Sequence, residues 1–136
     1  MSEYKNQVRS NLKGKPYRTE VFIGSHTLIT DEPLDKGGMN DGPEAHSILL
    51  AALVACTSIT VKMYIDRKGW DVGEIAIDCS MTRTIEKGEQ HTFAIQNISF
   101  TKDIDEATKN RILAISKKCP VHKTLSPAIS IETNIL

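Results

Sequence analysis

The sequence predicts a single α+β domain over residues 1–136, with antiparallel strands and two helices. Three observations predict this fold class. Polar and apolar residues alternate with a period of two near the N-terminus and again after Trp70. A long apolar segment between Pro43 and Gly69 has the length of a helix, and a shorter segment at residues 104–115 has one apolar face. Strands, helix, hairpin, helix and strand in this order are typical of an α+β domain.

The first strands are expected near the N-terminus. Residues 17–23 alternate, and Gly24-Ser25 is a two-residue hairpin turn into a second strand at residues 26–30. An edge strand within residues 5–13, ended by the turn at residues 14–16, is also expected. The segment 31–43 that follows is rich in Gly, Pro, Asn and Asp, so we expect a long loop there.

The central helix is expected to begin at Asp41 or Gly42, with Pro43 in its first turn, and to run to about Lys68. Gly69 then closes its C-terminus. Residues 48–56 are apolar on every side, and such a helix is expected to be buried on every side. We therefore expect either a helix wrapped by sheet or one shared with a second subunit.

The C-terminal half is expected to form a hairpin, a helix and a final strand. Residues 75–81 and 93–100 alternate on either side of the turn EKGEQ, with a phase slip at Gln96-Asn97 that predicts a bulge. Asp103 starts a capping-box pattern for a helix that ends at Cys119-Pro120. Residues 129–135 alternate as a last strand.

Composition limits the class of partner and compartment. The chain has 136 residues, 40% of them hydrophobic, which suits one domain with its own core. Seventeen basic and 17 acidic residues balance, so neither a nucleic acid nor an anionic membrane is an expected partner. The polar N-terminus does not look like a signal peptide, and the apolar run at 48–56 is too short to span a bilayer. We expect a cytoplasmic protein.

The three cysteines are the candidate chemistry of the chain. Cys56, Cys79 and Cys119 lack C-x-x-C spacing, and a cytoplasmic chain seldom uses structural disulfides. A metal site from Cys56, Cys119 and a histidine is an open alternative, but redox chemistry is preferred, with no metal or organic cofactor. Cys79 lies on the apolar side of a strand and is expected to be a plain core residue.

Each thiol of the candidate pair has two interpretations. Cys56 is either a small core side chain or a reactive thiol, and burial in mid-helix raises a thiol pKa, so reactivity would require a nearby cation. Hydroxyl groups at Thr57, Ser58 and Thr60 are candidate donors to it. Cys119 is expected at a helix C-terminus, where the helix dipole disfavours a thiolate, so it suits a resolving thiol better than a first nucleophile.

Two segments resemble the OsmC/Ohr family. They are residues 31–69, DEPLDKGGMNDGPEAHSILLAALVACTSITVKMYIDRKG, and CPVHKTL at residues 119–125. The shared pattern is a loop with GG and GP, an LLAAL-like run ending in A-C-T, and a second cysteine far downstream. The likeness is greater to the broad OsmC-like branch than to Ohr proper.

The resemblance implies an OsmC-like fold, with antiparallel sheets packed on a long central helix that carries Cys56, in an intertwined homodimer with its two sites at the subunit interface. It also implies a peroxidase that reduces organic hydroperoxides in oxidative stress. Cys56 matches the peroxidatic position and Cys119 the resolving one. An external dithiol, a lipoylated protein in Ohr relatives, would reduce the pair again.

The chain departs from the family pattern near two expected site residues. The glutamate that orients an arginine in hydroperoxide-specific members is His46 here, flanked by Ala45 and Ser47, with Glu44 as a candidate substitute. The arginine region falls on residues 15–18, where Arg18 is the preferred cation and Lys15 the alternative.

The remaining motif residues have a structural and a functional interpretation. His122 is either a solvated helix-end residue or a base that assists the resolving thiol. Asp31, Glu32, Gly37 and Gly38 are expected to shape the site without taking part in chemistry. A binding protein with an interface cleft for a small apolar or electrophilic ligand, and a purely structural dimerisation module, are the alternatives to the enzyme.

Overall fold

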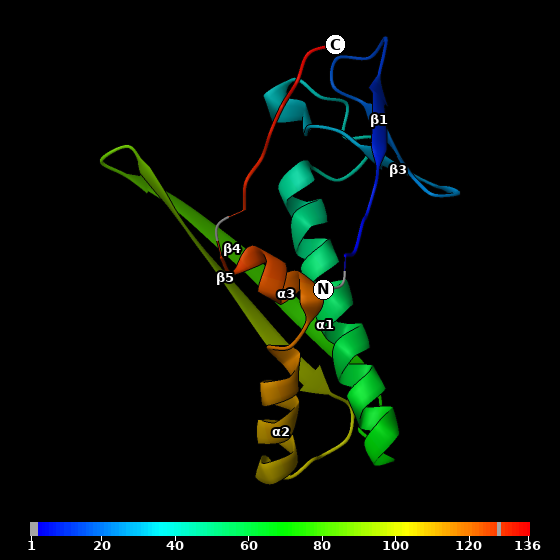
Figure 1. Cartoon of the computed structure of the whole chain (residues 1–136), viewed down its shortest axis with the longest axis vertical. Coiled ribbons are helices and arrows are strands. Elements are labelled where there is room, and N and C mark those ends of the chain that lie inside the picture. The colour runs from blue at the N-terminus through cyan, green and yellow to red at the C-terminus, as the bar shows by residue number, and fades with distance from the viewer. Residues whose placement is uncertain (1–2, 128) are drawn as a thin grey trace. The chain divides into compact units, whose positions relative to one another are not determined.

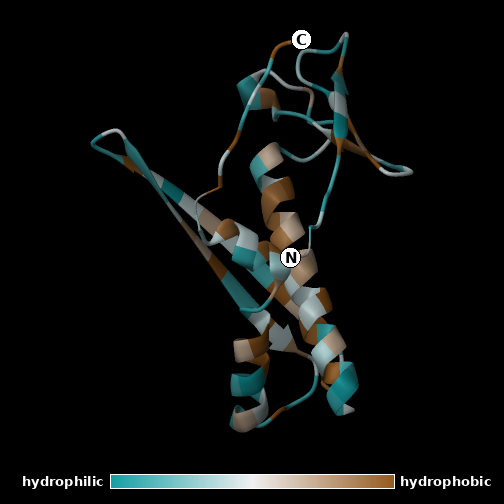
Figure 2. Cartoon of the chain, in the orientation of Figure 1, coloured by the Kyte–Doolittle hydropathy of each residue, from teal (hydrophilic) through white to brown (hydrophobic). Residues whose placement is uncertain are grey.

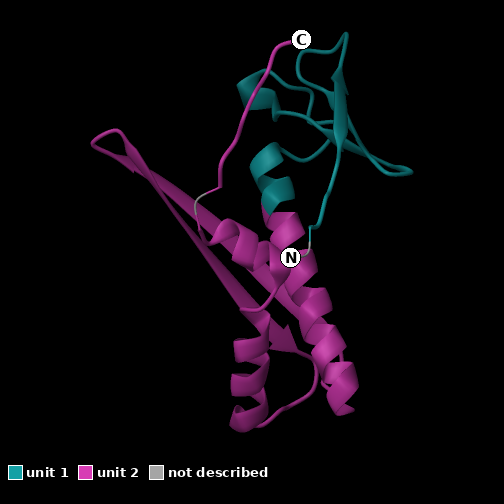
Figure 3. Ribbon diagram, in the orientation of Figure 1, with its two compact units in different colours: residues 1–49 teal, residues 50–136 magenta. Residues whose placement is uncertain are grey.

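The computed structural model describes residues 3–127 and 129–136, in two compact units, residues 1–49 and 50–136 (Figure 3). The chain is α+β with antiparallel sheets and one long helix, as predicted (Figure 1). Its elements are β1 (Arg9–Leu12), β2 (Thr19–Ile23), β3 (His26–Thr30), the 3₁₀ helix η1 (Leu34–Lys36), α1 (Ala45–Lys68), β4 (Ile75–Glu86), β5 (Glu89–Phe100), α2 (Glu106–Ser116) and α3 (Pro120–Leu125).

The first unit holds an antiparallel sheet in the order β1-β2-β3. The hairpin turn at Gly24-Ser25 is confirmed, because Ile23 pairs with His26 and Gly24 has φ 59°, which a tight two-residue turn requires. The expected edge strand is β1, in which Arg9 pairs with Phe22. The unit therefore follows the alternation of its sequence closely.

Helix α1 ends as predicted but starts later. It begins at Ala45, so Pro43 precedes the helix, and Gly69 ends it with φ 68°. Figure 2 shows apolar residues along much of this helix, with hydrophilic ones at its C-terminal end. By length and composition α1 could also cross a bilayer, contrary to the expectation from the run 48–56, but core helices of soluble proteins have the same properties.

The expectation that α1 is buried on every side is wrong for the single chain. Its buried residues are spaced by four and form one stripe: Leu53, Thr57, Val61 and Ile65. On other faces Leu49, within the run 48–56, is 41% exposed, and Ile59 and Met63 beyond it are 55% and 63% exposed. Hydropathy alone does not bury a residue, because burial also requires an element packed against that face.

The hairpin β4–β5 pairs without interruption, so the bulge expected at Gln96-Asn97 is wrong. Asp78 pairs with Asn97 and Cys79 with Gln96 in continuous register. The phase slip in the sequence marks a change of apolar face along β5: Ile98 and Phe100 are half-buried, whereas Phe93 points to the other face and is 66% exposed. The expected turn is confirmed at Lys87-Gly88, both with positive φ.

The core of the second unit joins α1 to α2. Its buried members are Val61, Ile65, Val72 and Ile112, with Trp70, Ile75, Phe100 and Ile104 packed against them. Burial of each large aliphatic side chain stabilises the fold by about 1.5–3 kcal/mol. Helix α2 is capped by Asp105, whose Oδ1 accepts from Thr108 N at 2.7 Å, and not by Asp103 as expected.

The last strand expected at residues 129–135 does not form. These residues have no regular structure, and Ile131 is 81% and Ile135 is 99% exposed. Alternating residues make a stable strand only when a neighbouring strand pairs with them. Within the described part of the chain, residues 129–136 have no such neighbour.

Candidate functional site

Cys119 caps the N-terminus of α3. Its Sγ accepts a hydrogen bond from His122 N at 3.5 Å, and the residue is fully buried. Pro120 takes the first position of the helix, where its fixed φ suits the helical turn and its missing N–H leaves no donor unpaired. The sequence Cys-Pro thus places a sulfur at the end of a helix where backbone N–H groups are free to donate.

This position corrects the sequence-based prediction for Cys119, which placed it at a helix C-terminus. Helix α2 ends at Ser116, and the chain crosses Lys117 and Lys118 before α3 begins. N–H groups therefore meet the sulfur, where carbonyl groups were expected. The sequence does carry an indication of this helix start, because Pro120 directly follows Cys119 and proline is common at the first position of a helix.

The structure brings Cys56 and Cys119 together. Cys56 lies half-buried on α1, and its side chain is within hydrogen-bonding reach of Cys119, with both thiols reduced. Spacing along the sequence did not determine this proximity. Cys79 lies half-buried on β4, where burial raises the pKa of its thiol, and it is not among the buried core residues expected to include it.

The two thiols differ in their electrostatics. Burial raises the pKa of Cys56, and Cys119 beside it raises the pKa further. Burial would also raise the pKa of Cys119, but hydrogen bonds from Cys56, from His122 N–H and from Thr57 outweigh it, so the pKa of Cys119 is lowered. The two thiols interact with each other, so they ionise as a pair.

The hydroxyl donors suggested by the sequence divide between the two sulfurs. Thr60 lowers the pKa of Cys56, whereas Thr57 acts on Cys119. The backbone N–H of Val121 acts on both thiols, and His122 contributes its backbone N–H to Cys119. The sequence indicates only the imidazole of His122 as a candidate group, because the positions of backbone donors depend on the fold.

No three His, Cys, Asp or Glu side chains gather as metal ligands in residues 3–127 or 129–136. Within these ranges, the chemical groups of the thiol site are sulfur, hydroxyl and backbone N–H. Such a site is suited to thiol redox chemistry or to binding an electrophile.

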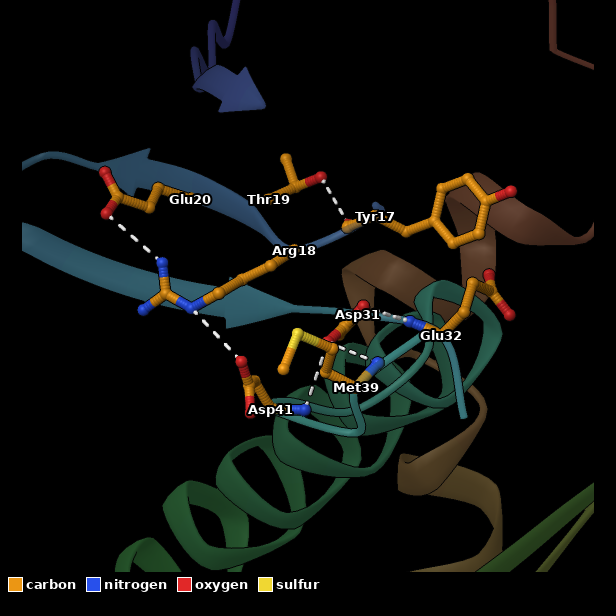
Figure 4. Close-up of polar contacts among 8 residues, drawn as sticks. All are labelled: Tyr17, Arg18, Thr19, Glu20, Asp31, Glu32, Met39 and Asp41. Atoms are coloured by element: carbon orange, nitrogen blue, oxygen red, sulfur yellow. Dashed lines mark hydrogen bonds and ion pairs between the residues drawn. The ribbon is translucent and has the colours of Figure 1, made fainter. Parts of the chain in front are cut away.

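In the first unit, Asp31 organises the glycine-rich loop (Figure 4). Its carboxylate is 3% exposed and accepts three backbone N–H groups: Glu32 at 2.8 Å, Asp41 at 3.1 Å and Met39 at 3.3 Å. Burial alone would raise the pKa of Asp31, but these bonds and the nearby Arg18 lower it.

Glycine is required at two positions of this loop, since a Cβ on Gly42 would lie 2.2 Å from the carbonyl oxygen of Ile29. A Cβ on Gly38 would lie 1.9 Å from the carbonyl oxygen of Glu32, which allows no larger residue without a backbone shift. Asp31, Glu32 and Gly38 thus shape this loop, in which Gly37 has φ 85°. That these four residues shape the site around the thiols stays a prediction.

Arg18 lies just before β2 and pairs with two carboxylates (Figure 4). Its Nη1 is 3.6 Å from Glu20 Oε1 and its Nε is 3.6 Å from Asp41 Oδ2, with the side chain 35% exposed. The alternative cation, Lys15, is exposed in the preceding turn. Arg18 belongs to residues 1–49 and the thiols to residues 50–136, so its role toward them remains a prediction.

His46 and Glu44, where the sequence departs from the family pattern, both lie near the start of α1. His46 is exposed in the first turn. Glu44, the candidate substitute for the family glutamate, pairs with Lys36 at 3.5 Å. The carboxylates that form ion pairs with Arg18 are instead those of Asp41 and Glu20. The sequence pattern did not indicate either residue as a partner of this arginine.

The fold and site define a class of α+β proteins that carry a pair of reduced thiols, one on a long helix and one capping a short helix. The family model described as "OsmC-like protein" matches residues 38–134. The chain therefore belongs to the OsmC-like family. No curated protein sequence matches it.

Solved structures share the fold at low sequence identity. An OsmC-like protein from Mycoplasma pneumoniae has a TM-score of 0.76 at 19% identity, over 91% of this chain and 89% of that one. Organic hydroperoxide resistance proteins from Legionella pneumophila and Bacillus subtilis have TM-scores of 0.69 and 0.65, both at 12% identity. The Legionella match covers 93% of this chain and 92% of that one, and the Bacillus match 90% and 91%.

Replacement of the Asp31 carboxylate should loosen the loop. In Asp31→Asn one acceptor oxygen becomes an N–H donor that faces backbone N–H groups, so hydrogen exchange at the Met39 and Asp41 amides should accelerate. Because the folded protein lowers this pKa, the stabilisation is complete above the usual aspartate value of about 3.9 and is lost as the pH falls through the lower folded value. Exchange measured by mass spectrometry at several pH values checks both statements.

Asp35→Asn is the matched control, because Asp35 is an exposed carboxylate of the same loop. Equal protection of the two amides in Asp31→Asn and Asp35→Asn would contradict the role of Asp31.

Proposed function

We propose that this protein is a thiol-dependent peroxidase that reduces organic hydroperoxides. The observation that carries the proposal is the apposition of a half-buried Cys56 with a fully buried, capped Cys119. Membership of the OsmC-like family supports it, since two solved proteins of similar fold are described as organic hydroperoxide resistance proteins.

The proposed reaction uses the thiols in sequence. Cys56 Sγ attacks the distal peroxide oxygen, the O–O bond breaks, and the alkoxide leaves as an alcohol after taking a proton. Cys56 is now a sulfenic acid. Cys119 Sγ attacks its sulfur, water leaves, and a disulfide forms. An external dithiol, such as a lipoylated protein, then reduces the disulfide by exchange and is itself oxidised.

Exposure supports this assignment of roles. Cys56 is partly exposed, whereas Cys119 is fully buried. A peroxide from solvent would reach the first sulfur more readily. The second sulfur needs only to contact its neighbour, and burial protects it from direct oxidation.

Arg18 is proposed to balance charge at Cys56. Burial raises the pKa of that thiol, so its thiolate needs a cation. Asp41 and Glu20 orient the guanidinium within the first unit, and they could take the place of the glutamate that is His46 here. Lys15 is the alternative cation.

A homodimer is proposed as the functional form. Apolar side chains at Ile59, Met63 and Phe93 are 55%, 63% and 66% exposed in the single chain. Isolated apolar residues at a surface are common, but this set spans α1 and β5 and suits an interface between two copies. We propose that the dimer acts in the cytoplasm, without nucleic acid, membrane or metal partner.

A non-catalytic binder of a small apolar or electrophilic ligand at the dimer interface is the alternative function. The raised pKa of Cys56 favours it, as does the exposed His46 where hydroperoxide-specific relatives have a glutamate. One equivalent of cumene hydroperoxide added to the reduced protein separates the two. The peroxidase should lose two free thiols per chain rapidly, and the binder should lose none.

Substitution of the cysteines should separate the steps of the reaction. Cys56→Ser should abolish dithiol-supported hydroperoxide consumption, because it removes the nucleophile. Cys119→Ser should leave Cys56 as a sulfenic acid or mixed disulfide, which a dimedone probe and mass spectrometry detect. Cys79→Ser is the control and should consume hydroperoxide normally; retained activity in Cys56→Ser would exclude the mechanism.

Loss of the cation should slow the first step. An opposite charge within about 4–6 Å lowers a thiol pKa by about 1–3 units, so Arg18→Ala should decrease consumption of cumene hydroperoxide at pH 7 by about ten- to a thousandfold. Lys15→Ala should have little effect. Stopped-flow measurement of both variants decides between them, and a decrease confined to Lys15→Ala would assign the cation to Lys15.

The oligomeric state can be measured directly. Sedimentation equilibrium should give twice the 15.1 kDa mass of the chain. Met63→Glu should shift the protein toward monomer, because it places a charge on the exposed apolar face of α1. Lys62→Glu, at the adjacent and exposed position, should not, since its ion pair with Asp66 is a surface pair of little energy. A monomeric wild-type protein would refute the dimer.

A further inference from the structure

Basic residues are concentrated in the segment of the chain that carries Cys119. Residues 107–131 contain five Lys and Arg residues and no Asp or Glu. Because the whole chain has 17 basic and 17 acidic residues, the remainder of the chain has 12 basic and 17 acidic ones. The balanced net charge therefore conceals one strongly basic segment in an otherwise acidic chain. Such a separation of charge attracts partners of the opposite sign.

Three of these residues flank the buried thiol on both sides. Lys117 and Lys118 lie between α2 and α3, directly before Cys119, and Lys123 lies one helical turn beyond it in α3 (Figure 1). The N–H of Lys118 donates to Ile115 O at 2.9 Å, and the N–H of Lys123 donates to Cys119 O at 3.1 Å. We call Lys117, Lys118 and Lys123 the lysine cluster. The same two short helices hold the cluster and the sulfur, so the cluster has a fixed place beside the thiol.

The lysine cluster is exposed and has no ion-pair partner in the part of the chain that the structure describes. All three residues are exposed, and no carboxylate of residues 3–127 or 129–136 lies within 4.0 Å of their ammonium groups. A helix dipole favours a lysine at a helix C-terminus, which accounts for Lys117 at the end of α2. The dipole does not account for the lack of acidic residues throughout the segment 107–131.

The disulfide of the proposed reaction has to be reduced from outside the chain. Cys119 is fully buried and Cys56 is half-buried, so an external dithiol reaches Cys56 Sγ more readily. A partly covered sulfur can be attacked from few directions, and a donor that arrives in a suitable orientation therefore reacts faster. Complementary charge both raises the encounter rate and orients the two partners.

We propose that the lysine cluster docks a protein electron donor whose dithiol is surrounded by acidic residues. This inference rests on the proposed peroxidase function, because it names the partner that completes the reaction. Three ammonium groups on both sides of the sulfur suit an acidic protein surface better than a small dithiol, which has too few charges to pair with all of them. Exposed ion pairs add little affinity, so such a donor docks briefly and leaves after the exchange, as repeated turnover requires.

The proposed exchange balances in electrons and protons. One thiolate of the donor attacks Cys56 Sγ, the bond between Cys56 and Cys119 breaks, and Cys119 Sγ takes up a proton. The second thiol of the donor then attacks the mixed disulfide, releases Cys56 as a thiol and closes the donor's own disulfide. Two electrons and two protons thus pass from the donor to the chain.

The docking is tested on a disulfide made without peroxide. The full chain with Cys79→Ala is oxidised with diamide, so that Cys56 and Cys119 can form the only disulfide within it. Two reduced peptides with a Cys-Gly-Gly-Cys core, flanked on both sides by glutamates or by glutamines, serve as donors. The rate of each peptide is divided by its rate with hydroxyethyl disulfide, which is uncharged, so that differences in thiol reactivity cancel.

The acidic peptide should reduce the chain faster than the neutral one. At an ionic strength of about 0.01 M the normalised rate should be about tenfold higher for the glutamate peptide. At about 1 M salt the difference should vanish, because charges are then screened within about 3 Å. Quenched samples, alkylated and counted for free thiols by mass spectrometry, give the rates.

Substitution of the lysine cluster by glutamine should remove the preference for the acidic peptide. The neutral peptide should reduce this variant at the wild-type rate, since the disulfide itself is unchanged. Lys5→Gln, Lys13→Gln and Lys87→Gln together form the matched control, because they remove the same charge from exposed residues elsewhere and should keep the preference. Where the cluster variant is not folded by circular dichroism, Lys123→Gln alone should lower the preference by about twofold.

Several results would overturn the proposal. These are equal normalised rates for the two peptides at low salt, a preference that survives in the folded cluster variant, and failure of diamide to join Cys56 to Cys119. Tight binding of a DNA duplex at 150 mM salt, lost in the cluster variant, would assign the lysines to a nucleic acid and overturn it as well. Absence of hydroperoxide consumption, with the peptide preference as expected, would refute the peroxidase and leave the docking of an acidic dithiol donor intact.

Discussion

The contact between Cys56 and Cys119 is the interaction on which the proposed chemistry depends. A thiol on the long helix α1 meets a thiol at the first turn of α3, and the N–H of His122 hydrogen-bonds the second sulfur. The core of Val61, Ile65 and Ile112 holds α1 against α2, the helix that leads into this turn. Packing of apolar side chains thus brings the helix that carries Cys56 and the turn that carries Cys119 together.

Each of the two units holds its own arrangement of polar groups. In the first unit, the buried Asp31 arranges a glycine-rich loop by accepting three backbone N–H groups, and the same loop presents Asp41 to Arg18. In the second unit, sulfur, hydroxyl and backbone donors gather without a charged side chain in the pair itself. Asp41 on the loop and Glu20 on β2 both pair with Arg18 within the first unit.

Much of the local structure was predictable because it depends on neighbouring residues in the sequence. The Gly24-Ser25 turn, the end of α1 at Gly69 and the long hairpin follow from glycine conformation and alternation. The errors share a cause. The bulge at Gln96-Asn97, the final strand at 129–135 and the burial of α1 on every side all required knowledge of which element lies opposite a given face. Periodicity describes one element, whereas pairing and burial involve two.

The sequence by itself determined the α+β class, the family likeness and the two thiols that matter, because residue order and residue type are enough for those conclusions. Only the tertiary structure decided that the two thiols meet and which groups surround each sulfur. Cys119 was expected at the end of a helix, and it caps the beginning of the next, where N–H groups and Thr57 from a distant helix surround its sulfur. A pKa depends on groups that folding brings within a few ångströms, and separation along the chain does not specify them.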